Sequence, residues 1–169
     1  PEGFGLTTEL FRHKEAIIKH PQINREIDKL IRNNMAKLEQ ATGKQFGNPE
    51  NPLLLSVRAG TAVSMPGAMS TFLNVGMNDE VAEGLARQPG FGRTAWDCYR
   101  RFLQSWGTTH GISREEFDTI NANFESKYNV MRNIDFTSDQ MKEIAQKYKK
   151  VLQEHDIRIH DEPYKQLRR

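Results

Sequence analysis

A short apolar run ends in an arginine, and a loop rich in glycine and hydroxyl side chains follows. The run is Leu53–Val57, and Arg58 comes directly after it. Arginine presents a planar set of N–H donors that matches phosphate oxygens, and glycines let backbone N–H groups approach an anion closely. Thr61 and Ser64 add hydroxyl donors in the loop. The segment is a candidate polyphosphate site, although an ordinary loop whose arginine pairs with a carboxylate fits the same residues.

Other residues with chemical potential have simpler explanations. Gly43-Lys44 lacks the upstream glycine and the following Ser or Thr of a P-loop, and a predicted helix precedes it, so we expect a turn. The five histidines lack the spacing of metal ligands, and no metal site is predicted. Cys98 lies beside an aromatic stripe that is more typical of a hydrophobic core than of a base-stacking surface.

Composition narrows the class of protein. The 169 residues include 24 basic and 22 acidic side chains, for a formal net charge of +2. This balance gives no reason to expect nucleic acid or an anionic membrane as a partner. No apolar run approaches the roughly 20 residues that span a bilayer. A single cysteine fits a reducing compartment, and we expect a cytoplasmic location.

Most of the chain has helical periodicity. Helices are predicted from Thr8 to Lys19, after Pro21, from Asn78 towards Arg87, and along the stripe Trp96, Tyr99, Leu103 and Trp106. Capping boxes at Ser113–Glu116 and Thr137–Gln140 predict two more helix starts. Leu53–Val57 is predicted to be a buried strand, and Phe72–Val75 a second short strand.

These elements predict a predominantly helical α+β fold in two parts. Residues 1–77 combine helices with the strand and the glycine loop, and residues 78–169 form a small helical subdomain that ends with the start of a further helix. The chain begins at Pro1 rather than methionine, and the last predicted helix stops soon after it starts. We therefore expect both ends to be cut.

Several motifs together resemble the pyruvate, phosphate dikinase family. The strongest runs from Asn51 to Gly60 and continues through Met65-Pro66-Gly67, which is similar to the family's glycine-loop region. Further similar stretches are Pro1–Glu9, Thr42–Gly47, Leu73–Asp79 and Tyr99–Ser105. The resemblance extends over essentially the whole chain and is strongest from about Thr42 to Ser105.

The resemblance implies part of an ATP-grasp-like lobe within residues 1–77 of an enzyme that uses ATP and Mg²⁺. Such an enzyme converts ATP, phosphate and pyruvate to AMP, pyrophosphate and phosphoenolpyruvate, through a phosphorylated histidine on a separate domain. Arg58 falls on the family's phosphate-binding arginine, and Gly60, Gly67 and Met69 fall on its glycine loop. The family commonly has Ser, Met and Asp where this chain has Ala59, Ala68 and Ser70, which puts polar contacts from positions 59 and 70 in doubt.

The resemblance also implies what this chain lacks. The second ATP-grasp half with its metal ligands, the phosphohistidine domain and the pyruvate domain are expected elsewhere in the parent, as partners of this segment. We therefore expect the fragment to be inactive and to bind no cofactor tightly. Two alternatives are the nucleotide domain of a phosphoenolpyruvate synthase and a non-catalytic helical interaction module.

Overall fold

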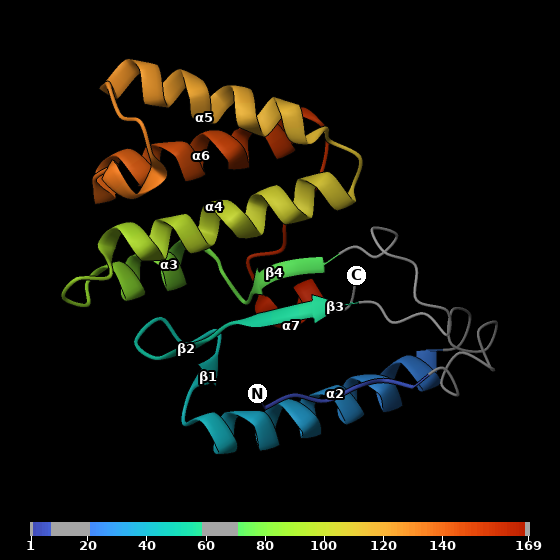
Figure 1. The fold of residues 1–169 in the computed structure, drawn as a ribbon. Coiled ribbons are helices and arrows are strands. Elements are labelled where there is room, and N and C mark those ends of the chain that lie inside the picture. Colours follow the sequence, from blue (N-terminus) through green and yellow to red (C-terminus); the bar gives the residue numbers. More distant parts are fainter. Residues whose placement is uncertain (1, 8–20, 59–70, 168–169) are drawn as a thin grey trace. The chain divides into compact units, whose positions relative to one another are not determined.

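The computed structural model describes residues 2–7, 21–58 and 71–167 (Figure 1). The predicted helix from Thr8 to Lys19 lies outside these residues. Contacts group the chain into two compact units, residues 1–46 and 47–169. The boundary expected at 77/78 falls inside the second unit, and the functional division at that point remains a prediction.

The first unit contains helix α2 (Pro21–Thr42) and strand β1 (Gln45–Phe46). Proline is well tolerated at the first helical position because its missing N–H would have no intrahelical partner there. The helix ends at Gly43, whose φ of +69° is left-handed and whose N–H donates to the Glu39 carbonyl at 2.8 Å. The prediction that Gly43-Lys44 is a turn rather than a P-loop is confirmed.

The second unit combines short strands with helices. Its strands are β2 (Pro52–Leu53), β3 (Leu55–Arg58) and β4 (Thr71–Val75). Its helices are α3 (Asp79–Ala86), α4 (Gly92–Thr109), α5 (Arg114–Tyr128), the 3-10 helix η2 (Asn133–Asp135), α6 (Ser138–Glu154) and α7 (Pro163–Leu167). The described part of the chain is predominantly helical with few strands, as predicted.

Helix α4 is the centre of the second unit. One of its faces packs on β4, and others pack on α3, α5 and α6 (Figure 1). The aromatic stripe predicted to be core is buried: Trp96, Tyr99 and Trp106 are each at most 3% exposed. Burying such large rings supplies much of the hydrophobic stabilisation of a domain this small.

The helix starts follow the predicted caps with one difference. Asn78 Oδ1 accepts from the N–H of Val81 at 2.7 Å, and Thr137 with Gln140 forms a full reciprocal capping box. Ser113 also caps its helix, but the Glu116 side chain does not complete a box. Its carboxylate instead lies 3.1 Å from Nε2 of His155.

The prediction of one buried strand at Leu53–Val57 is wrong in part. Leu53 is buried, but it belongs to β2, and Leu54 separates it from β3. Ser56, Val57 and Arg58 in β3 are exposed. An apolar run cannot show which of its residues find a packing partner. Among the described strands, β3 pairs with β4 alone.

Candidate functional site

Arg58 lies at the end of one strand of a β-hairpin. Strands β3 and β4 pair antiparallel, with Val57 opposite Phe72 and Arg58 opposite Thr71. The pairing therefore holds Arg58 and Thr71, the residues on either side of 59–70, next to each other. The Arg58 side chain is exposed at this end of the hairpin, where its guanidinium donors are accessible to an anion.

The other candidate binding residues lie outside the described residues. These are Gly60, Thr61, Ser64, Gly67 and Met69. Of the predicted phosphate-binding residues, the structure thus places Arg58 alone.

Strand β4 attaches this hairpin to α4. The Phe72 ring lies 5.1 Å from the Trp106 ring, centroid to centroid, and the Leu73 N–H donates to Ser105 Oγ at 3.1 Å. Asn74 has a left-handed φ of 54°, and its Nδ2 donates to the Cys98 carbonyl at 3.0 Å. These contacts connect the strand that follows residues 59–70 to the buried core of the helical unit.

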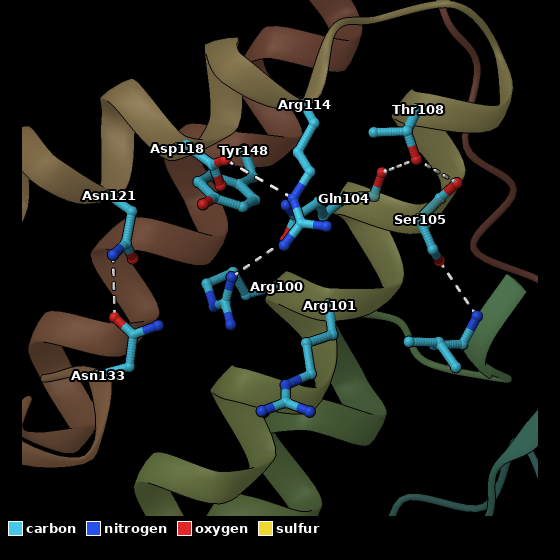
Figure 2. A pocket seen from close by; sticks show the side chains of 11 residues that line it. Arg100, Arg101, Gln104, Ser105, Thr108, Arg114, Asp118, Asn121, Asn133 and Tyr148 are labelled. Atoms are coloured by element: carbon cyan, nitrogen blue, oxygen red, sulfur yellow. Dashed lines mark hydrogen bonds and ion pairs between the residues drawn. The ribbon is translucent and has the colours of Figure 1, made fainter. Parts of the chain in front are cut away.

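A second polar site was not predicted from the sequence. It is a pocket of about 410 Å³ between α4 and α5, with one wall from α6 and η2 (Figure 2). Its charged lining residues are Arg100, Arg101, Arg114 and Asp118. The signal in the sequence is Arg100, Gln104 and Thr108, polar residues one helical turn apart that continue alongside the aromatic stripe of α4.

Arg100 is the buried charge of this pocket. Its Nε and Nη2 donate to Asp97 Oδ1 at 3.0 and 2.8 Å, and its Nη1 donates to Gln104 Oε1 at 3.2 Å. The guanidinium carbon also lies 5.7 Å from the centre of the Tyr148 ring. Burial acts to lower the pKa of Arg100, but the negative charge and hydrogen bonds of Asp97 outweigh it, so the pKa is raised. Arg100 is a fixed positive charge at every physiological pH.

The described residues show neither a metal centre nor a membrane span. Within 2–7, 21–58 and 71–167, no three His, Cys, Asp or Glu side chains are grouped as metal ligands would be. None of the helices in that part of the chain is long and apolar enough to cross a membrane.

Comparison with known proteins identifies the family. No protein-family model matches the chain. The pyruvate, phosphate dikinase of Clostridium symbiosum is 40% identical over 155 residues, which cover 91% of this chain and 18% of that protein. The enzyme of the same name from Rickettsia prowazekii is 39% identical over 173 aligned positions, covering 99% of this chain and 19% of that protein. The one from Giardia intestinalis is 38% identical over 152 residues, covering 89% and 17%.

The chain spans less than a fifth of the length of these curated relatives. Similarity at this level nevertheless runs along nearly all of its own residues. The chain therefore belongs to the pyruvate, phosphate dikinase family, as the counterpart of one segment of its proteins.

Proposed function

We propose that this chain forms part of the ATP-binding region of a pyruvate, phosphate dikinase. The parent enzyme converts ATP, phosphate and pyruvate to AMP, pyrophosphate and phosphoenolpyruvate. The observation that carries the proposal is the position of Arg58. It is exposed at the end of β3 and lies opposite Thr71, so these two residues flank the segment 59–70. The dikinase name of the relatives favours this enzyme over the phosphoenolpyruvate synthase alternative.

In this proposal Arg58 binds phosphate oxygens of ATP. A guanidinium at the end of a strand can donate two parallel hydrogen bonds to a phosphoryl group and offset its negative charge. Gly60, Gly67 and Met69 cover the nucleotide, and Thr61 and Ser64 donate hydroxyl hydrogen bonds. Mg²⁺ would further offset the triphosphate charge, with its ligands supplied by other parts of the parent protein.

The proposal extends to the domains. Residues 1–77 belong to an ATP-grasp-like lobe, and residues 78–169 form a helical subdomain that supports β4 through α4. The partners are the second ATP-grasp half, the phosphohistidine domain and the pyruvate domain of the parent. Its single cysteine suits a reducing, cytoplasmic setting.

The isolated chain should not catalyse the dikinase reaction and should bind ATP weakly. An ATP site of this type lies between two lobes. This chain supplies part of one lobe, and the metal ligands are expected on the other, so the site in the isolated chain is incomplete. Incubation of the purified chain with labelled ATP should leave no residue phosphorylated.

The decisive experiment substitutes Arg58 in the full-length parent enzyme. One charge-assisted hydrogen bond contributes about 1.5–3 kcal/mol, and loss of transition-state electrostatics lowers rates by roughly 100-fold or more. Arg58→Ala should lower the rate of enzyme phosphorylation from ATP, measured without pyruvate, by at least that factor. Arg58→Lys should recover little of the rate, because an ammonium group cannot make the paired contact.

Thermal melting of each variant separates chemistry from folding. The Arg58 side chain is exposed, so the variants should melt close to the parent. Arg158→Ala, at another exposed arginine, is the matched control and should keep normal phosphorylation. A well-folded Arg58→Ala enzyme with near-normal phosphorylation would end the phosphate-binding assignment.

A further inference from the structure

The pocket between α4 and α5 carries more positive than negative charge. Asp97 pairs with both Arg100 and Arg101, and Asp118 pairs with Arg114. These three guanidinium and two carboxylate groups carry a net charge of +1, because Asp97 is shared by two arginines. A polar pocket of about 410 Å³ with such an excess suits a small anion.

Arg114 is the arginine of this set that is most available to a ligand. Its side chain is 79% exposed, and its Nε lies 3.6 Å from Asp118 Oδ2, beyond hydrogen-bond distance. Exposed pairs of this kind contribute little to stability, so exchanging Asp118 for a ligand costs little. Figure 2 shows Arg114 reaching from α5 towards Arg100 and Gln104 on α4. A phosphate between the two guanidinium groups would receive donors from both helices.

Asn121, one of the residues that line the pocket, has a buried acceptor without a donor. Asn121 Nδ2 donates to Glu125 Oε1 at 2.8 Å and to Asn133 Oδ1 at 3.0 Å, which fixes the orientation of the amide. Asn121 Oδ1 is buried and has no hydrogen-bond partner. A buried, unpaired acceptor is costly, and a ligand hydroxyl would satisfy it.

We propose that this pocket binds a small metabolite that carries both a phosphate group and a hydroxyl group. The phosphate lies at the guanidinium groups of Arg100 and Arg114, and the hydroxyl donates to Asn121 Oδ1. Arg101 adds positive charge at the margin. Arg58 is not among the described residues that line the pocket.

Calorimetric titration of the 169-residue chain at constant low ionic strength tests the proposal, with three probes. Glycerol 3-phosphate carries both groups, ethyl phosphate lacks the hydroxyls, and glycerol lacks the phosphate. Glycerol 3-phosphate should bind saturably and more tightly than ethyl phosphate, and glycerol should not bind measurably. Absence of saturable glycerol 3-phosphate binding overturns the proposal, and equal binding of ethyl phosphate overturns the hydroxyl contact.

Matched variants locate the binding. Arg114→Gln should weaken glycerol 3-phosphate binding about tenfold or more, the effect of losing a charged hydrogen bond. Arg132→Gln is the control, since Arg132 is also exposed and paired with a nearby carboxylate, Asp135, and it should leave the affinity unchanged. Arg58→Gln should leave it unchanged as well. Equal losses in Arg114→Gln and Arg132→Gln would mean general charge attraction and overturn the site.

Discussion

The Glu143 carboxylate accepts two hydrogen bonds through one oxygen, Oε2. The Tyr128 hydroxyl donates at 2.8 Å and the Lys127 ammonium group at 3.1 Å. These two hydrogen bonds hold the pKa of Glu143 below its ordinary value, and the one from Tyr128 has the larger effect. A carboxyl with a lowered folded-state pKa stabilises the fold above its unfolded-state pKa. That contribution is lost as the pH falls through the folded-state value.

Tyr128→Phe should therefore raise the pKa of Glu143 towards its ordinary value. The phenylalanine ring keeps the contact with Lys127, whose Nζ lies 4.6 Å from the centre of the Tyr128 ring, so the hydroxyl is the main loss. Side-chain carboxyl signals followed by NMR through an acid titration measure the change. The pKa of Asp135, held low chiefly by its hydrogen bond with Arg132, is the internal control and should not move. An unchanged Glu143 pKa would contradict this assignment.

At this scale, sequence spacing predicts the residues that bond locally and misses those that bond distantly. Ser113 caps its helix as its sequence pattern indicates, and Thr137 and Gln140 complete the predicted box. Glu116 occupies the same place in the pattern as Gln140 but pairs with His155, 39 residues along the chain. Spacing within one turn carries no information about a histidine at the end of another helix.

Helix α3 lies close to the loop before β2 at Gly84. A Cβ on this residue would be 2.3 Å from the Pro49 carbonyl oxygen and 2.6 Å from its Cβ. Gln88 Nε2 donates to the Glu50 carbonyl at 2.9 Å, a second contact between the end of α3 and this loop. Glycine in a helix usually lowers stability by about 0.5–1 kcal/mol relative to alanine. Its presence at position 84 is therefore explained by the close approach of Pro49, which leaves no room for a side chain.

Gly84→Ala should lower the free energy of unfolding although it improves helix propensity. The new methyl meets backbone atoms that cannot rotate away, and overpacking of this kind costs about 1–3 kcal/mol or more. Urea unfolding followed by circular dichroism measures the effect. Glu80→Ala, at an exposed position of the same helix, is the control and should change stability by no more than about 0.5 kcal/mol. A Gly84→Ala chain more stable than the original would show that the approach of α3 to Pro49 is looser than described.

Among the elements, helices are better predicted than strands. Helices α3, α5 and α6 begin at side-chain caps, and α4 and α6 follow apolar stripes, both of which are local properties. The strand predicted at Leu53–Val57 is divided between β2 and β3, and most of β3 is exposed. Burial of a strand depends on what covers its faces, and a four- or five-residue apolar run does not specify that.

At the scale of the whole chain, the resemblance predicted the family, while periodicity predicted the helical content. The pocket between α4 and α5 could not be predicted, because its lining residues are spread from Leu73 to Tyr148 and meet only after the helices pack. Of the predicted ATP-site residues, Arg58 has a described position, and its role remains a prediction. Folding brings distant residues together in ways that spacing along the sequence does not express.

Gln166 connects the end of the described chain to the turn between β4 and α3. It is 4% exposed, and its Oε1 accepts from the Gly76 N–H at 2.9 Å. Its Nε2 donates to the carbonyls of Met77 and His160 at 2.9 and 2.8 Å. One buried side chain thus satisfies backbone groups about 90 positions away, and leaving such groups unpaired costs about 1–3 kcal/mol each.

Gln166→Glu should destabilise the chain in a pH-dependent way. An ionised carboxylate has no donor for the Met77 and His160 carbonyls and is costly to bury, so its folded-state pKa should rise above the unfolded value. Below the unfolded-state pKa the protonated carboxyl can donate to only one of the two carbonyls, so the variant should recover part of the lost stability there. It should lose stability relative to wild type as the pH rises through the folded-state pKa.

Gln166→Leu should lose stability by a similar amount at every pH, and Lys165→Ala, on the exposed side of α7, should lose little. Urea unfolding at several pH values gives the free energy of unfolding of each variant, from which the wild-type value at the same pH is subtracted. A pH-independent difference for Gln166→Glu would show that position 166 is reached by solvent and does not connect α7 to the Gly76 turn.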